Sequence, residues 1–265
     1  GTPAFSFASV MERVRAVVRA VEPHDSVERY RGLGVDVVPG QARIVNPWTV
    51  EITPPDGPVQ RLTTRSIVIA AGARPAVPPL AGLDDVDYVT SDTLWERFGA
   101  LDAPPRRLLV LGGGPIGCEL AQAFARLGSQ VTQVELAPRL LAREDDDVAE
   151  AVRRALQADG VRVLTGHEAL RCERHGADRL LVARADGAEV PLPFDALLVA
   201  VGRQARLEGY GLEALGTPLG RVVETDDYLQ TLYPNIFAAG DVAGPYQLTH
   251  VAAHQAWYAA VNALF

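Results

Sequence analysis

Cysteine, long hydrophobic runs and an excess of basic residues are all scarce or missing in this 265-residue sequence. Cysteine occurs only at Cys118 and Cys172, which argues against a disulfide framework and makes a reducing cytoplasm the expected compartment. No apolar run approaches the roughly 20 residues that span a bilayer, and residues 1–20 lack the basic-then-apolar order of a signal peptide. The net charge of −8 argues against general attraction to nucleic acid or anionic membranes, so neither is an expected partner.

The composition that remains is ordinary for a globular protein, with 48% hydrophobic and 22% charged residues, and the length has room for two domains. Apolar residues recur at three- to four-residue spacing from Phe7 to Ala20, which predicts an amphipathic helix; a short helix is expected over 25–34. Short β-type runs separated by proline, glycine and aspartate predict a small antiparallel layer, and they cover 35–40, 42–46, 48–54 and 60–64. The segment SIVIAAGARP (66–75) predicts a buried strand that runs into a glycine loop.

Strands and helices alternate from Arg107 onward, which predicts parallel strands with right-handed crossovers. The expected strands are 108–112, 130–136 and 161–166, and the helices between them are 115–128 and 145–160. An antiparallel ribbon at 169–192, a buried strand at 194–203, a strand and glycine turn at 235–244 and a helix at 247–265 complete the order. The expected fold class is therefore α/β.

The segment LGGGPIG (111–117) joins the first of these strands to the first helix. Gly112, Gly114 and Gly117 spell G-x-G-x-x-G, in which the first glycine allows a tight turn, the second lets the main chain approach a pyrophosphate, and the third permits close helix–strand packing. Unpaired N–H groups and the helix dipole favour an anion there, and proline suits the first helical position. This context predicts a dinucleotide site formed by Gly112, Gly113, Gly114, Pro115, Ile116 and Gly117.

Glu135 ends the strand VTQVE, 18 residues beyond Gly117. A carboxylate at this place accepts hydrogen bonds from the adenosine ribose hydroxyls, although a solvated acid at a strand end is the alternative. Its charge repels a 2′-phosphate and so favours NAD over NADP. Arg139 and Arg143 follow closely and could partly reverse that preference.

Cys118 and Glu119 stand in the first turns of the same helix. The helix N-terminus would lower the pKa of the Cys118 thiol, but a small buried packing residue is the favoured interpretation, and no second cysteine lies near enough for a local dithiol. Glu119 could complement the helix dipole, face solvent or point at a cofactor, and residue chemistry alone does not choose. His250 and His254 lie one helical turn apart without a third ligand nearby, so no metal site is expected.

Three segments in this order, IVIAAGARP (67–75), GGGPIGCELA (112–121) and YLQTLYPNIFAAGDVAG (228–244), carry a resemblance to a known family. The sequence resembles the pyridine nucleotide–disulfide oxidoreductases, the flavoprotein group of dihydrolipoamide dehydrogenase, glutathione reductase and mercuric reductase, over nearly its whole length. It is most similar to mercuric reductase-like members. The resemblance implies a Rossmann-like NAD(P)-binding domain inserted in an FAD-binding domain.

The resemblance also implies roles for individual residues. Glu119 matches the family glutamate that pairs with a lysine beside the flavin N5 and is the one catalytic candidate. Gly202 and Arg203 match the V-G-R segment at which the nicotinamide domain returns to the flavin domain. The remaining matches concern FAD: Gly240 and Asp241, whose aspartate holds a ribitol hydroxyl, and Ala71 and Gly72, where alanine replaces the threonine of an A-T-G turn.

Family members begin with a G-x-G-x-x-G segment for FAD and a C-x4-C redox pair, and they end with an interface domain; none of these occurs in this sequence. The expectation is the middle of a longer enzyme, with an FAD-binding domain in two parts, 1–99 and 223–265, around an NAD(P)-binding domain, 100–222. FAD is expected to bind weakly or not at all to this chain. The parent is expected to be a homodimer through its C-terminal domain.

The function implied for the parent is FAD-dependent reduction of a disulfide or metal substrate by NAD(P)H. Hydride would pass from nicotinamide to flavin N5 and electrons then to a cysteine pair that this chain lacks, so the chain alone is expected to be inactive. One alternative is a catalytically inactive NAD(H)-binding module. Another is an NADH oxidase or ferredoxin reductase-like flavoprotein with a different electron acceptor.

Overall fold

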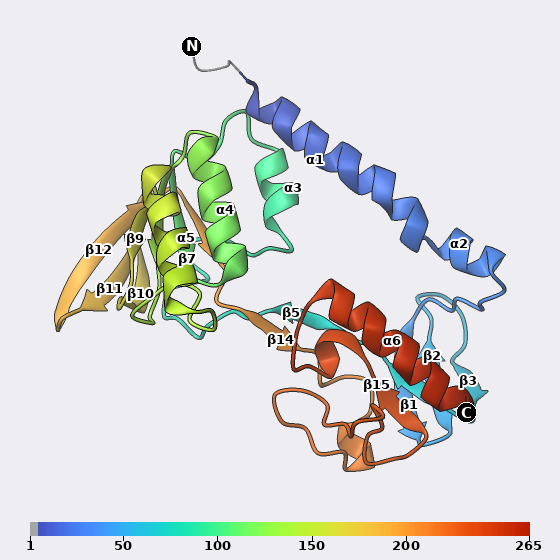
Figure 1. The fold of residues 1–265 in the computed structure, drawn as a ribbon. Helices are drawn as coiled ribbons and strands as arrows, with labels where there is room; N and C mark the ends of the chain where they lie inside the picture. The colour runs from blue at the N-terminus through green and yellow to red at the C-terminus, as the bar shows by residue number, and fades with distance from the viewer. Residues whose placement is uncertain (1–4) are drawn as a thin grey trace. The chain divides into compact units, whose positions relative to one another are not determined.

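A computed structural model describes residues 5–265 of the chain. The residues form two compact units (Figure 1). The first unit combines residues up to Glu22 with Pro75–Gly202, and the second combines Pro23–Arg74 with Arg203–Phe265. The second unit is discontinuous, as expected for a host domain around an inserted one, and the first unit adds the residues up to Glu22 to the inserted segment Pro75–Gly202.

A parallel sheet forms the centre of the first unit. Its strands lie in the order β6 (Tyr88–Val89), β13 (Ala196–Val199), β7 (Arg107–Leu111), β8 (Gln130–Val134) and β9 (Arg162–Leu164). The register pairs Leu111 with Val134, and Val199 also pairs with Leu111, so the carboxyl ends of these three strands meet at one edge. This is the arrangement that the alternation of strands and helices predicts.

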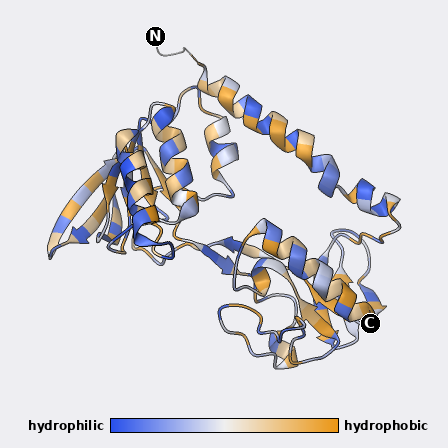
Figure 2. Cartoon of the chain, viewed as in Figure 1, coloured by the Kyte–Doolittle hydropathy of each residue, from blue (hydrophilic) through white to orange (hydrophobic). Residues whose placement is uncertain are grey.

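One face of this sheet is covered by α3 (Leu94–Gly99), α4 (Pro115–Arg126) and α5 (Asp146–Ala158) (Figure 1). The first turns of α1 (Phe7–Val21) pack against α3 and α4. Phe124 of α4 is the centre of an aromatic contact, with its ring 5.4 Å from that of Phe98 and 6.4 Å from that of Phe7. Hydrophobic and hydrophilic residues alternate along α1, as the sequence predicts (Figure 2), and this helix buries Phe7 and Met11.

An antiparallel ribbon packs against the other face of the sheet. It consists of β10 (Glu168–His175), β11 (Asp178–Ala185) and β12 (Ala188–Phe194). Leu181 and Phe194 of the ribbon share a buried cluster with Leu109 and Leu111 of β7. The ribbon was expected from the sequence and is confirmed.

Short strands and one long helix make up the second unit. An antiparallel layer contains β1 (Gln41–Asn46), β2 (Thr49–Thr53) and β3 (Gln60–Thr63); separate pairs join β4 (Ile67–Ile69) with β15 (Ile236–Ala238), and β5 (Ala73–Pro75) with β14 (Arg203–Ala205). The helices are α2 (Val27–Gly32) and α6 (Thr249–Leu264), with short 3-10 turns η1 (Glu22–Asp25), η2 (Glu213–Leu215) and η3 (Gly240–Val242). The core of this unit gathers around Leu212, Ile236 and Val242.

One expected strand does not form. Residues 35–39 are irregular rather than extended in a sheet, so that part of the antiparallel layer was wrongly predicted. The physical reason is local: Pro39 has no N–H to donate, and Val35 is 49% exposed, so the segment neither completes a ladder nor buries its valines.

The compact units overlap with the expected domain ranges but place the residues up to Glu22 and residues 75–99 with the parallel sheet, and residues 203–222 with the second unit. Assignment of these ranges to NAD and FAD stays a prediction, because compactness does not report cofactor binding. Within residues 5–265, no helix is long and apolar enough to cross a membrane.

Candidate functional site

The glycine-rich turn at residues 112–114 connects the end of β7 to the start of α4, at the carboxyl edge of the parallel sheet. Gly112 has a φ of +119°, and a Cβ there would lie 2.3 Å from the carbonyl oxygen of Ala200. A Cβ on Gly117 would lie 2.4 Å from the carbonyl oxygen of Gly112. Because both obstacles are backbone atoms, the fold itself requires glycine at these two positions.

Gly114 differs from these two glycines. Its φ is −77°, and no heavy atom lies within 4 Å of the position that a Cβ would take. Pro115 occupies the first position of α4, and the following N–H groups in that turn have no acceptor within the helix. Open space in front of free N–H groups is what a pyrophosphate needs, so the residues present fit a dinucleotide at this point.

Glu135 directly follows β8 and lies beside the same turn. Its Oε2 accepts the N–H of Gly113 at 2.5 Å, and its Oε1 accepts the N–H of Ala137 at 2.7 Å. A Cβ on Gly113 would lie 2.8 Å from that carboxylate. The structure therefore brings Glu135 and the turn together, and the role of this carboxylate toward a ribose stays a prediction.

Gln133 is a residue of this site that sequence reasoning missed. It is fully buried on β8, and its Nε2 donates to the carbonyl oxygen of Gly112 at 3.0 Å. This bond fixes the first residue of the turn from the neighbouring strand. A signal existed in the sequence: Gln133 alternates with Val131, so a polar side chain stands on a face of the strand where an apolar one is expected.

Cys118 packs under the turn rather than facing solvent. It is 6% exposed, with its Sγ 3.5 Å from the carbonyl oxygen of Gly113. Burial raises the pKa of the Cys118 thiol, and the nearby charges of Glu135 and Glu119 add to that rise. Burial likewise raises the pKa of Cys172 to about 11. The interpretation of both cysteines as structural residues agrees with these surroundings.

Glu119 is exposed on α4, one residue after Cys118. Within the described chain, no hydrogen bond or ion pair is recorded for it. The 25 lysine and arginine residues of the sequence are all arginines. The lysine that the resemblance implies as the partner of Glu119 is therefore not in this sequence. Its role beside a flavin stays a prediction.

The two arginines that follow Glu135 differ in their surroundings. Arg139 donates from Nη1 to the carbonyl oxygen of Glu144 at 2.7 Å and from Nη2 to that of Ala142 at 3.1 Å. Its guanidinium is thus held by its own loop. Arg143 is exposed.

Gly240 and Asp241, which the resemblance assigns to FAD, lie in the turn after β15. Gly240, with a φ of +79°, donates its N–H to Oε1 of Gln255 at 2.8 Å, and Nε2 of Gln255 donates to the carbonyl oxygen of Gly244 at 2.8 Å. Gln255 on α6 therefore ties the turn together, and sequence reasoning did not identify it. Asp241 follows at the start of η3, with its Oδ2 3.9 Å from Nε of Arg203.

Of the other residues assigned by resemblance, Ala71, Gly72 and Gly202 lie in loops and Arg203 begins β14. Ala71 and Gly72 connect β4 to β5, and Gly72 has a φ of +68° with open space around its Cβ position. Gly202 follows β13 and accepts the N–H of Ala76 at 2.9 Å. Arg203 donates from Nη2 to the carbonyl oxygen of Ala73 at 3.0 Å. The structure thus joins Arg203 to Asp241 and to the end of the 71–72 loop.

The histidine pair on α6 has no metal-site geometry around it. His254 makes an edge contact with the ring of Tyr258, 4.8 Å between centroids. Across residues 5–265 there is no group of three or more histidine, cysteine, aspartate or glutamate side chains that could hold a metal ion.

The comparison with known proteins decides the family. The model of the family described as pyridine nucleotide-disulphide oxidoreductase matches residues 6–256. The chain belongs to this family. Among its relatives, a mercuric reductase of Staphylococcus aureus is 33% identical over 99% of the chain and 47% of the relative. A dihydrolipoyl dehydrogenase of Pseudomonas aeruginosa is 39% identical over 84% of the chain and 46% of the relative.

A solved structure supports the same assignment. The HOCl-induced flavoprotein disulfide reductase RclA from Escherichia coli matches with a TM-score of 0.82 and 30% identity, over 97% of this chain and 57% of that one. The α/β fold class with a Rossmann-like domain inserted in an FAD-binding domain is therefore confirmed, as is the resemblance from which it came. The chain spans about half the length of the curated relatives that it matches.

Proposed function

We propose that this chain supplies the NAD(H)-binding unit and part of the FAD-binding unit of a flavin-dependent oxidoreductase. The observation that carries the proposal is Gly114, a glycine with ordinary φ and no neighbour at its Cβ position, in front of the free N–H groups of α4. Packing within the protein does not account for it, whereas close approach of a pyrophosphate does. Family membership supports the same ligand class.

The proposed ligand is NAD(H) rather than NADP(H). The Glu135 carboxylate beside the turn would accept ribose hydroxyls and repel a 2′-phosphate. Arg139, which could have offset that charge, is held by carbonyl groups of its own loop. Calorimetric titration tests this: NADH should bind more tightly than NADPH, and equal affinity or a preference for NADPH would contradict the assignment.

The chain's own residues bind and orient in this proposal. The N–H groups at the start of α4 would hold the pyrophosphate, and Glu135 would hold the adenosine ribose. In the second unit, Asp241 would hold a flavin ribityl hydroxyl, at a position fixed by the Gln255 hydrogen bonds to the same turn. When bound, the nicotinamide and flavin supply hydride transfer.

A second candidate is an NAD(H)-binding module without reductase activity of its own. Cys118 and Cys172 favour it, because both are free, both are buried, and they belong to separate core clusters. Neither side chain can act as a redox dithiol, so electron transfer to a disulfide or metal would require groups beyond this chain. Homodimerisation of the longer parent is proposed on the same family basis.

The two candidates differ in measurable ways. The purified chain should release added FAD on gel filtration and should not oxidise NADH when lipoamide or Hg(II) is supplied. Retained, stoichiometric flavin absorbance would support the chain as part of an FAD-binding unit, and acceptor-dependent NADH oxidation would rule out the inactive module. NADH binding without flavin retention or turnover would support the module.

A further inference from the structure

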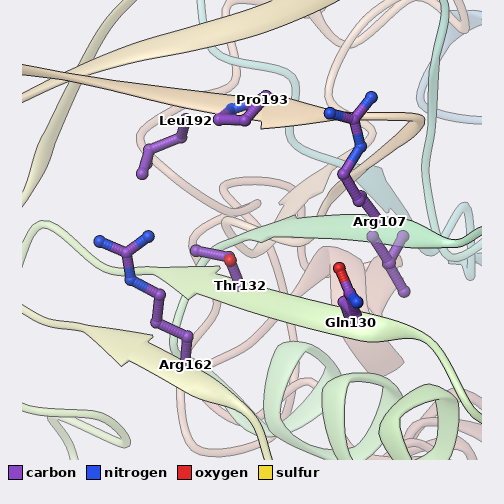
Figure 3. A pocket seen from close by; sticks show the side chains of 7 residues that line it. Arg107, Gln130, Thr132, Arg162, Leu192 and Pro193 are labelled. Atoms are coloured by element: carbon purple, nitrogen blue, oxygen red, sulfur yellow. The ribbon is translucent and has the colours of Figure 1, made fainter.

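A polar pocket of about 170 Å³ lies at the amino-terminal edge of the parallel sheet, at the opposite end of the strands from the glycine turn. Four polar side chains form its floor: Arg107 at the start of β7, Gln130 and Thr132 on β8, and Arg162 at the start of β9. Leu192 and Pro193 of β12 form its apolar wall (Figure 3).

The strand register places these four side chains on one face. Arg107 pairs with Gln130, and Thr132 pairs with Arg162. Paired residues of a parallel sheet point to the same side, as do residues two apart on one strand. All four therefore face the ribbon, on the same side as Leu109 and Leu111, which the ribbon covers.

The polarity of this face changes along the strands. Its carboxyl half is built from apolar residues such as Leu111 and Val134, both in the buried cluster beneath the ribbon. Its amino half consists instead of two cations, an amide and a hydroxyl. Gln130 and Arg162 are exposed and Arg107 and Thr132 are half-buried, so all four polar side chains can reach an occupant that enters from solvent.

The charges around the pocket are not balanced. Arg107 directs Nε and Nη2 at Asp195, at 3.1 and 2.5 Å, which leaves its Nη1 turned away from that pair. Asp195 thereby neutralises Arg107. The negative charge of Asp178 also raises the pKa of Arg107, and the positive charge of Arg106 also lowers the pKa of Asp195. Arg162 is exposed, and within the described chain no ion pair is recorded for it. The pocket thus retains one positive charge next to several donors.

We propose that this pocket binds a small oxyanion, a phosphate or a carboxylate group, between Arg162 and Nη1 of Arg107. Thr132 and Gln130 lie on β8, between the strands that carry Arg107 and Arg162 (Figure 3), and their hydroxyl and amide groups would donate to the same anion. Guanidinium groups are the side chains best matched to such oxygens, and the volume suits an ion or the acidic end of a small metabolite. This site is separate from the dinucleotide site and does not depend on it.

Backbone NMR of the isotope-labelled chain tests the proposal, with inorganic phosphate as one probe and acetate as the other. Saturable shifts of the amide signals of Gln130, Thr132 and Arg162 are expected with at least one probe. The probe that gives saturable shifts identifies the ligand group as a phosphate or a carboxylate. Because phosphate also suits the start of α4, amides at 112–118 report that second site separately.

Two variants isolate the pocket. Arg162→Gln should weaken the affinity measured at these amides about tenfold, and Gln130→Leu should weaken it without any change of charge. Arg65→Gln, in the second unit, removes the same charge elsewhere and should leave the affinity unchanged. The proposal is overturned if shifts stay confined to 112–118 or stay linear with anion concentration, or if Arg162→Gln and Arg65→Gln behave alike.

Discussion

Replacing Gly117 by alanine should destabilise the first unit although alanine is the better helix former. A Cβ at Gly117 would lie 2.4 Å from the carbonyl oxygen of Gly112, well inside the 3.5–4.0 Å at which such atoms pack favourably. Overpacking against backbone costs about 3 kcal/mol, and the gain in helix propensity returns about 1 kcal/mol. The expected net loss is about 2 kcal/mol of the free energy of unfolding, or about 4–8 °C in Tm.

The comparison variant is Gly114→Ala, because nothing lies within 4 Å of its Cβ position. Its cost should stay below about 1 kcal/mol, the loss of a favourable residue at the helix cap. Thermal and urea unfolding, followed by circular dichroism, measure both variants. The reasoning is refuted if Gly114→Ala loses as much stability as Gly117→Ala, or if Gly117→Ala is neutral.

Three further predictions follow from the same contacts. Glu135→Gln should weaken NADH binding by about tenfold or more, because it removes a charge-assisted acceptor, and it should narrow the difference in affinity between NADH and NADPH. Glu144→Gln, the same change in the following loop, should alter the affinity for neither nucleotide. Cys118 and Cys172 should react with a thiol reagent at pH 8 only after unfolding in urea, since burial raises the pKa of both thiols; rapid labelling of the folded chain would contradict this. Asp195→Asn should lower the free energy of unfolding by about 1 kcal/mol at pH 7. Arg107 lowers the pKa of Asp195, so the stabilisation is lost as pH falls through this lowered pKa. The free energies of unfolding of the wild type and Asp195→Asn should therefore converge in strong acid. A difference between them that stays constant with pH would exclude the ion pair as its cause.

The sequence was sufficient to predict the parallel sheet and the position of the glycine turn. The period of the apolar residues and the glycine spacing both concern neighbours along the chain, as does the contact that requires Gly117, whereas Gly112 is required by the distant Ala200. The strand expected at 35–40 was wrong: Pro39 lacks an N–H donor in any surroundings, whereas the exposure of Val35 depends on what lies next to it in the fold.

The supporting residues of the turns were not predictable in the same way. Gln133 reaches the turn from the neighbouring strand, and Gln255 reaches the turn after β15 from a helix that follows it. Both make hydrogen bonds whose partners are fixed by tertiary packing. The polar pocket at Arg107 and Arg162 likewise depends on strand register, since these residues are far apart in sequence.

The central claim is that a dinucleotide lies against the main chain at Gly114. Titration of NADH into Gly114→Val tests it most directly, with Gly32→Val as the matched control, because both glycines have open space and neither has a strained φ. The account predicts that Gly114→Val remains folded and binds NADH at least about tenfold more weakly, because its side chain occupies the place of the pyrophosphate, while Gly32→Val binds like the wild type. Unchanged NADH affinity in folded Gly114→Val would contradict it.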